Sequence, residues 1–148
     1  MEDVLLPLGQ VAAIGGAVAI GPLLWWRQRS RSSTPAGRLR ALTLLTLFLT
    51  FDLIVFGAFT RLTDSGLGCP DWPGCYASAS PFGAREHIDA AQAAMPTGPV
   101  THGKAWIEMI HRYLATAVGV LIIAIAVGQV RANGDGDDRS EEHTSELQ

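Results

Sequence analysis

The residues of this chain best suited to chemistry are an acid, an imidazole and a guanidinium in residues 107–112, with the sequence IEMIHR. Glu108 and His111 are three residues apart, so in a helix they lie on one face. The stretch opens the last apolar segment, and ionisable groups are costly in hydrocarbon. Their presence there predicts a function. The alternative is an interfacial turn whose charges sit among lipid headgroups.

His111 could act in two ways if residues 41–60 and 105–130 are antiparallel membrane spans. An imidazole inside a helix bundle is a natural axial ligand for haem iron, and a proton relay is the alternative. The helical rise places His111 about 9 Å, Asp52 about 12 Å and Glu108 about 5 Å below the outer boundary. These three side chains could face one another, although Asp52 could equally be a structural acid bonded to a neighbouring helix.

Three apolar segments are long enough to cross a membrane: residues 4–26, within an N-terminal segment 1–26, and residues 41–60 and 105–130. The first contains small residues for close helix contact. A cleavable signal peptide is the other interpretation of the first segment, but its acidic start favours a retained span. The predicted fold class is an all-α integral membrane protein with three transmembrane helices. The small residues of the first apolar segment that could allow close helix contact are Gly15, Gly16 and Gly21.

The connecting segments predict the orientation. Residues 27–40 carry five arginines and no acid, which is typical of a cytoplasmic loop, whereas nucleic-acid binding is the rarer alternative. The N-terminus and the loop 61–104 are then outside, and residues 83–95 of that loop could form a short amphipathic helix. Residues 131–148 form a polar tail, and its end, 139–148, resembles a translated sequencing adapter. We exclude this end from fold reasoning. The chain's net charge of −3 also argues against a nucleic-acid partner.

The two cysteines lie in the outer loop, in the sequence CPDWPGC. Prolines and glycines between and beside Cys69 and Cys75 can fold this segment back, bringing the sulfurs within bonding range. A structural disulfide and a redox-active pair are both open. A metal site with His87 or His102 is a third possibility with poor ligand spacing.

GAFTRLTDSGLGCPDWPGCY and MPTGPVTHGKAWIEMIHRYLA closely resemble haem A synthases, particularly the proteobacterial form with an extra N-terminal helix. The resemblance covers roughly residues 42–127. It implies an integral membrane enzyme with two pseudo-symmetric four-helix halves, of which this chain supplies part of one. It also implies oxidation of the C8 methyl of haem O to the formyl of haem A, with haem b as cofactor. A bacterial inner membrane location follows, with the cysteine loop periplasmic. Haem O synthase and an electron acceptor such as quinone are possible partners.

The resemblance also implies residue roles. Glu108 and His111 match the family's E-x-x-H, where the histidine ligates haem and the glutamate takes part in oxidation. Cys69 and Cys75 match a loop pair that forms a disulfide in part of the family. Arg61 and Arg112 have no firm family role, and we hypothesise that they meet haem propionates, because arginine suits paired contacts with carboxylates.

A bis-histidine haem site needs a second ligand from another helix, and the predicted spans hold only one histidine. The family's second half is also missing. We therefore expect this 148-residue chain to be inactive alone. Finding haem A after expressing it in a host that makes haem O would contradict this prediction. The alternatives are a non-enzymatic membrane haem-binding or assembly protein and a thiol–disulfide membrane oxidoreductase.

Overall fold

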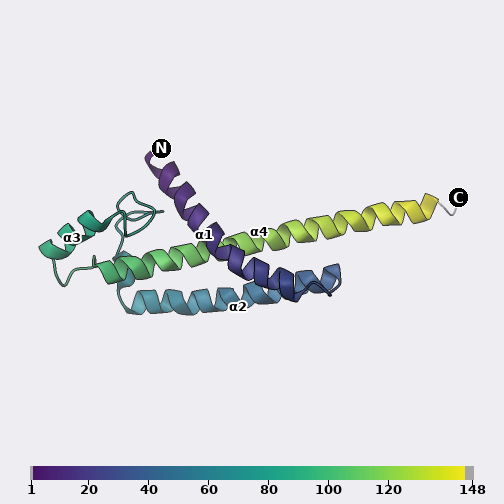
Figure 1. Ribbon diagram of the computed structural model, residues 1–148, viewed down its shortest axis with the longest axis horizontal. Helices are drawn as coiled ribbons and strands as arrows, with labels where there is room; N and C mark the ends of the chain where they lie inside the picture. Colours follow the sequence, from purple (N-terminus) through teal and green to yellow (C-terminus); the bar gives the residue numbers. More distant parts are fainter. Residues whose placement is uncertain (1, 146–148) are drawn as a thin grey trace.

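The computed structural model describes the backbone of residues 2–145 and the side chains of residues 5–134. Within them the chain is all-helical, with three long helices and a folded outer loop (Figure 1). The long helices contain candidate membrane spans at Leu5–Arg29, Pro35–Leu62 and His102–Gly134. This confirms the predicted fold class of an all-α membrane protein. The helices are α1 (Glu2–Arg29), α2 (Pro35–Leu62), the 3-10 turn η1 (Ser65–Leu67), α3 (Arg85–Ala94) and α4 (His102–Ser145).

The second helix begins earlier than predicted, at Pro35 instead of residue 41. Thr34 has an extended backbone and its hydroxyl accepts a hydrogen bond from the Gly37 N–H, at 3.2 Å. Such an N-cap followed by proline is a favoured helix start. The arginine-rich connection is therefore shorter than the predicted loop 27–40, and Arg38 and Arg40 lie on the first turns of α2.

The fourth helix extends beyond the predicted span at both ends. It begins at His102, not at residue 105, and continues through Ser145, past the predicted end at residue 130. No proline interrupts residues 131–145, and isolated glycines cost a preformed helix only about 1 kcal/mol each. Of the adapter-like end, residues 146–148 lie outside the described part.

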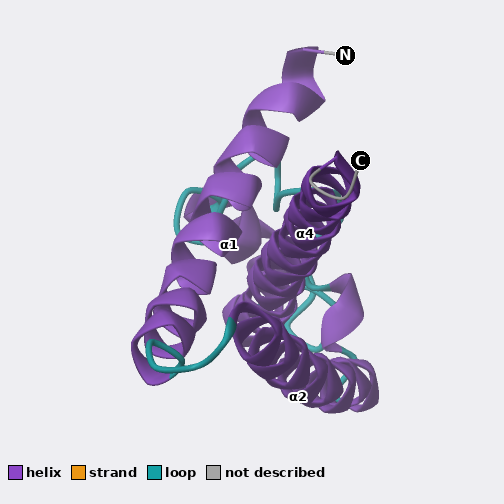
Figure 2. Cartoon of the chain, turned by 90° about the vertical axis from the view of Figure 1, so that its right-hand side faces the viewer, coloured by secondary structure: helices purple, strands orange, loops and turns teal. Residues whose placement is uncertain are grey.

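The helix α4 is the centre of the packing, since both α1 and α2 lie against it and touch each other little (Figure 2). α1 crosses α4 closely at Gly15. An ideal Cβ there would lie 2.4 Å from the Thr116 Cβ and 3.1 Å from the Tyr113 carbonyl oxygen. Gly16 and Gly21, also predicted as contact positions, have no such neighbour within 4 Å. A single glycine therefore permits the crossing.

Gly15 and Gly16 form a matched pair for testing this crossing. Gly15→Leu is expected to lower the free energy of unfolding by about 1–3 kcal/mol, because the added side chain must displace the α4 backbone or Thr116. Gly16→Leu points into open space and should change it by less than about 0.5 kcal/mol. Unfolding of both variants in mixed micelles, followed by circular dichroism, measures the difference. If both variants changed the free energy of unfolding equally, α1 and α4 would not cross at Gly15.

The best-buried cluster lies beneath the outer loop. The predicted amphipathic helix within residues 83–95 is confirmed as α3, which buries Ile88 completely. Its buried neighbours come from α1, the cysteine loop and α4: Val11, Cys69, Cys75, Ala84, Ala105, Met109 and Tyr113. In contrast, α2 exposes large apolar side chains along its length, including Phe48, Phe51 and Ile54. Such exposure suits a lipid environment.

Candidate functional site

The outer loop is closed by a disulfide between Cys69 and Cys75, with an S–S distance of 2.14 Å. The loop is held further by Asp71. Its carboxylate oxygens accept hydrogen bonds from the N–H groups of Tyr76 and Ala77, both at 2.6 Å. These two residues have φ values of 49° and 56°, in the left-handed region that is unfavourable for side chains other than glycine. The Asp71 bonds compensate for this cost, so the loop is a shaped structural unit.

Glu108 is buried below this loop, with 8% of its surface exposed. Its Oε2 accepts a hydrogen bond from the Cys69 N–H at 2.8 Å, and its Oε1 accepts one from Nη2 of Arg112. The bond from the guanidinium is charge-assisted, and such hydrogen bonds are stronger than neutral ones. The predicted catalytic acid is therefore in direct contact with the disulfide loop.

Arg112 connects the same loop to α4. Its Nη1 donates to the carbonyl oxygens of Asp71 at 2.9 Å, Pro73 at 3.3 Å and Gly74. Its Nη2 pairs with Glu108, one turn earlier on α4. Both terminal nitrogens are thus occupied within the protein. The structure gives Arg112 a role that the sequence did not predict, since a haem propionate would have to displace these contacts or use Nε.

His111 lies on another side of α4, against α2. Its ring centroid is 5.9 Å from that of Phe56, and Nε2 is the ring atom nearest to Gly57. A Cβ on Gly57 would lie 2.8 Å from that nitrogen, so a larger residue at position 57 would require the imidazole ring to shift. Gly57 was not predicted as a site residue. Its position within an apolar run gave no signal of a partner on another helix.

The chemistry of this imidazole fits a haem ligand, whereas its present orientation does not. The ring is half-buried beside an aromatic residue, and it makes no hydrogen bond within the described part of the chain. Its Nε2 faces the backbone of α2 at Gly57. Coordination of iron by this atom therefore requires the ring to turn, or α2 and α4 to move apart. Among the described residues no group of three or more His, Cys, Asp or Glu could hold a metal ion.

Two further predicted site residues are not brought into this arrangement. Asp52 is exposed and lies one turn from Phe56, so His111 packs closer to the outer end of α2 than the depth estimate predicted. Arg61 is exposed at the end of α2. Neither side chain makes a hydrogen bond or ion pair within the described residues. The polar partner of Glu108 is therefore Arg112, and the predicted partner Asp52 does not contact it.

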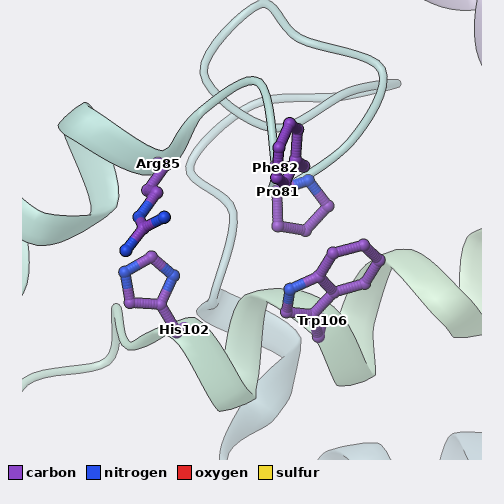
Figure 3. Close-up of a pocket in the computed structure, with 5 residues that line it drawn as sticks. All are labelled: Pro81, Phe82, Arg85, His102 and Trp106. Carbon is purple, nitrogen blue, oxygen red and sulfur yellow. The ribbon is translucent and has the colours of Figure 1, made fainter.

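The loop histidines have other contacts. His87 stacks on Tyr76, with centroids 5.3 Å apart, and His102 Nε2 lies 2.6 Å from an Asp89 carboxylate oxygen. The His102 contact joins α3 to the start of α4. Beside it is a cavity of about 280 Å³, in which Arg85 and His102 lie on one side and Phe82 with Trp106 on the other (Figure 3). This cavity does not include Glu108 or His111.

Fold and site together define an all-helical membrane protein in which an acid on a candidate spanning helix is bonded to the disulfide-closed loop between α2 and α4. Residues 40–143 match the family described as cytochrome oxidase assembly protein. The chain belongs to this family.

Among curated proteins the chain resembles the heme A synthase of Shewanella oneidensis. The two are 46% identical over 81 residues, which is 55% of this chain and 24% of the relative. The chain thus spans about a quarter of that protein's length. No solved structure matches it.

Proposed function

We propose that this chain forms the first part of a haem A synthase, which oxidises the C8 methyl of haem O to a formyl group. The observation that carries the proposal is the E-x-x-H pair of α4, with Glu108 bonded under the disulfide loop and His111 facing α2. Family membership and the identity to a heme A synthase support it. A membrane is the natural solvent for such an apolar porphyrin substrate.

In the proposal the two residues have separate tasks. His111 would hold haem iron through Nε2 once its ring turns from Gly57. A bound haem b would supply the one-electron chemistry that protein side chains lack. Conversion of the methyl to a formyl group would take one oxygen atom from water and release four protons and four electrons, and the electrons need an acceptor such as a quinone. Glu108 takes up a proton released as the methyl carbon is oxidised. Its Oε1 is paired with the Arg112 guanidinium and its Oε2 accepts from the Cys69 N–H, so the proton would add to a second lone pair of Oε2, whose partner is neutral.

The same proposal covers the cellular setting. The chain lies in a bacterial inner membrane with its disulfide loop in the periplasm, and haem O synthase delivers the substrate. The five arginines within residues 27–40, at the end of α1, in the turn and at the start of α2, support this orientation, since positive residues are retained on the cytoplasmic side.

Burial of the disulfide argues against a thiol–disulfide oxidoreductase that exchanges with partner proteins. Cys69 is 5% exposed and Cys75 is completely buried. Exchange requires an incoming thiolate to reach one of the sulfurs. The loop contacts of Glu108 and Arg112 also give this bond a structural task, which is to hold the Cys69 N–H over the carboxylate.

A chimera tests the proposal. The segment of the Shewanella oneidensis enzyme that matches this chain would be replaced by the corresponding residues of this chain. Haem A extracted from cells that make haem O is the readout. Production by the chimera supports the function, whereas a folded chimera that binds haem and makes no haem A contradicts it.

His111→Ala should remove haem absorbance from the purified chimera at the site in this half, because the substitution deletes the proposed iron ligand. The matched control is His87→Ala, which removes a loop histidine stacked on Tyr76 and should leave the spectrum unchanged. Haem content per protein and the visible spectrum measure both. An unchanged spectrum in His111→Ala would show that another residue binds the iron.

A further inference from the structure

The end of α1, the turn that follows it and the start of α2 carry a strong positive charge without local compensation. Five arginines lie at positions 27, 29, 31, 38 and 40, and no acid occurs between Asp3 and Asp52. No ion pair involves them in the part of the chain whose side chains are described. Like charges this close repel, so a bound anion would stabilise the turn.

Three of these arginines line one cavity of about 410 Å³, together with Trp26 and Ser30. The cavity wall is braced on both helices. The Trp26 indole N–H donates to the Arg38 carbonyl oxygen at 2.8 Å, which joins α1 to α2, and the buried Ser30 hydroxyl bonds the Trp26 carbonyl oxygen. The arginines that line the cavity are Arg27, Arg31 and Arg38.

Arg38 is held in place by the turn itself. Its Nε donates to the Ser33 carbonyl oxygen at 3.1 Å and its Nη2 to the Arg31 carbonyl oxygen at 3.0 Å. A fixed guanidinium loses less conformational entropy when it binds an anion than a free one does. The guanidinium groups of Arg27 and Arg31 make no hydrogen bond within the described residues and remain available to a ligand.

The position of the cavity identifies its ligand as an amphiphile. It lies where the candidate spans Leu5–Arg29 and Pro35–Leu62 end, at the end of α2 opposite the disulfide loop (Figure 1). Tryptophan beside arginine at such a boundary is typical of the lipid headgroup region. An exposed apolar side chain continues toward the membrane interior on α1, where Leu24 shares a helix face with Arg27 and Arg31. A ligand here meets cations at its head and hydrocarbon along its tail.

We propose that this cavity binds the phosphate headgroup of an anionic phospholipid, with Arg27 and Arg31 as its ligands and Arg38 as a fixed third cation. A zwitterionic lipid fits less well, because its own cation would lie among the arginines. Basic pockets at the cytoplasmic ends of membrane helices suit anionic headgroups for the same electrostatic reason. The site is distant from Glu108 and His111 and does not depend on the proposed function.

The test uses the purified full chain in neutral detergent, titrated with dioleoyl phosphatidylglycerol or with dioleoyl phosphatidylcholine. Lipid retained by the protein is counted by native mass spectrometry, and the melting temperature is followed in parallel. We expect retention and stabilisation with phosphatidylglycerol only. Inorganic phosphate at the same concentration should do neither, because it lacks the apolar tail. Equal retention of the two lipids, or stabilisation by phosphate alone, would overturn the proposal.

Two double variants distinguish lipid binding in the cavity from attraction by the overall positive charge of this region. Arg27→Gln/Arg31→Gln removes two cavity cations without removing a hydrogen bond of the turn, and it should weaken phosphatidylglycerol binding about thirtyfold. Arg29→Gln/Arg40→Gln removes the same charge from the same turn outside the cavity and should retain binding. Circular dichroism confirms that each is helical. If both double variants weakened phosphatidylglycerol binding equally, the lipid would be held by the general positive charge of this region, and the proposed site would be contradicted.

Discussion

Replacing Arg112 with alanine is expected to lower the free energy of unfolding by about 3–5 kcal/mol, because it removes the side chain that joins α4 to the disulfide loop. One guanidinium satisfies the Glu108 carboxylate and three loop carbonyl oxygens. Its side chain is only 16% exposed and that of Glu108 10%, so water cannot fully replace the lost donors. The variant would leave a buried carboxylate with the Cys69 N–H as its remaining partner.

The measurement is equilibrium unfolding of the chain in mixed micelles, with Arg61→Ala as the matched control. Arg61 is an exposed arginine of α2 and should change the free energy of unfolding by less than about 0.5 kcal/mol. Arg112→Lys should lie between the two, since an ammonium keeps the charge but cannot reproduce the planar set of donors. If Arg112→Ala matches the Arg61 control, the guanidinium does not hold the loop.

The helices could be predicted because their signals are local. Twenty or so apolar residues indicate a span, and the amphipathic pattern of α3 indicated its short helix. The predicted ends of the helices were less accurate. Thr34 and Pro35 form a recognisable start that a hydropathy boundary overlooks. Helix α4 continues past residue 130 although Asn133 and Gly134 are residues typical of helix ends. Composition alone does not distinguish an apolar boundary from a helix end.

The sequence singled out Glu108 and His111, and their chemical roles stay predictions. Their spacing predicted a shared helix face, whereas the structure places Glu108 against the loop and His111 on another side of α4, against α2. The Glu108–Arg112 pair has the i,i+4 spacing that favours an ion pair, so this signal was available. The three carbonyl contacts of Arg112 and the close approach of Gly57 join segments distant in sequence, and no local pattern encodes them.

Glu108 anchors the loop through the Cys69 N–H, and the proposed function gives it a second, separable task as a proton acceptor. Glu108→Gln separates them, because glutamine keeps the length and an acceptor oxygen but not the charge. In the chimera we expect haem A formation to fall at least about 100-fold, the usual cost of removing a general base. Haem content should remain, since His111 faces α2 and not the Glu108 carboxylate.

Stability distinguishes the two tasks in the same variant. Glu108→Gln should cost about 1–3 kcal/mol, because Arg112 loses its charged partner while its three carbonyl contacts persist. Glu86→Gln removes an exposed acid from the first turn of α3 and should change neither activity nor stability. Haem A yield at a temperature well below the midpoint of unfolding is the decisive measurement. A yield within tenfold of the unmodified chimera would leave Glu108 as an anchor of the disulfide loop alone, and the proton would need another acceptor.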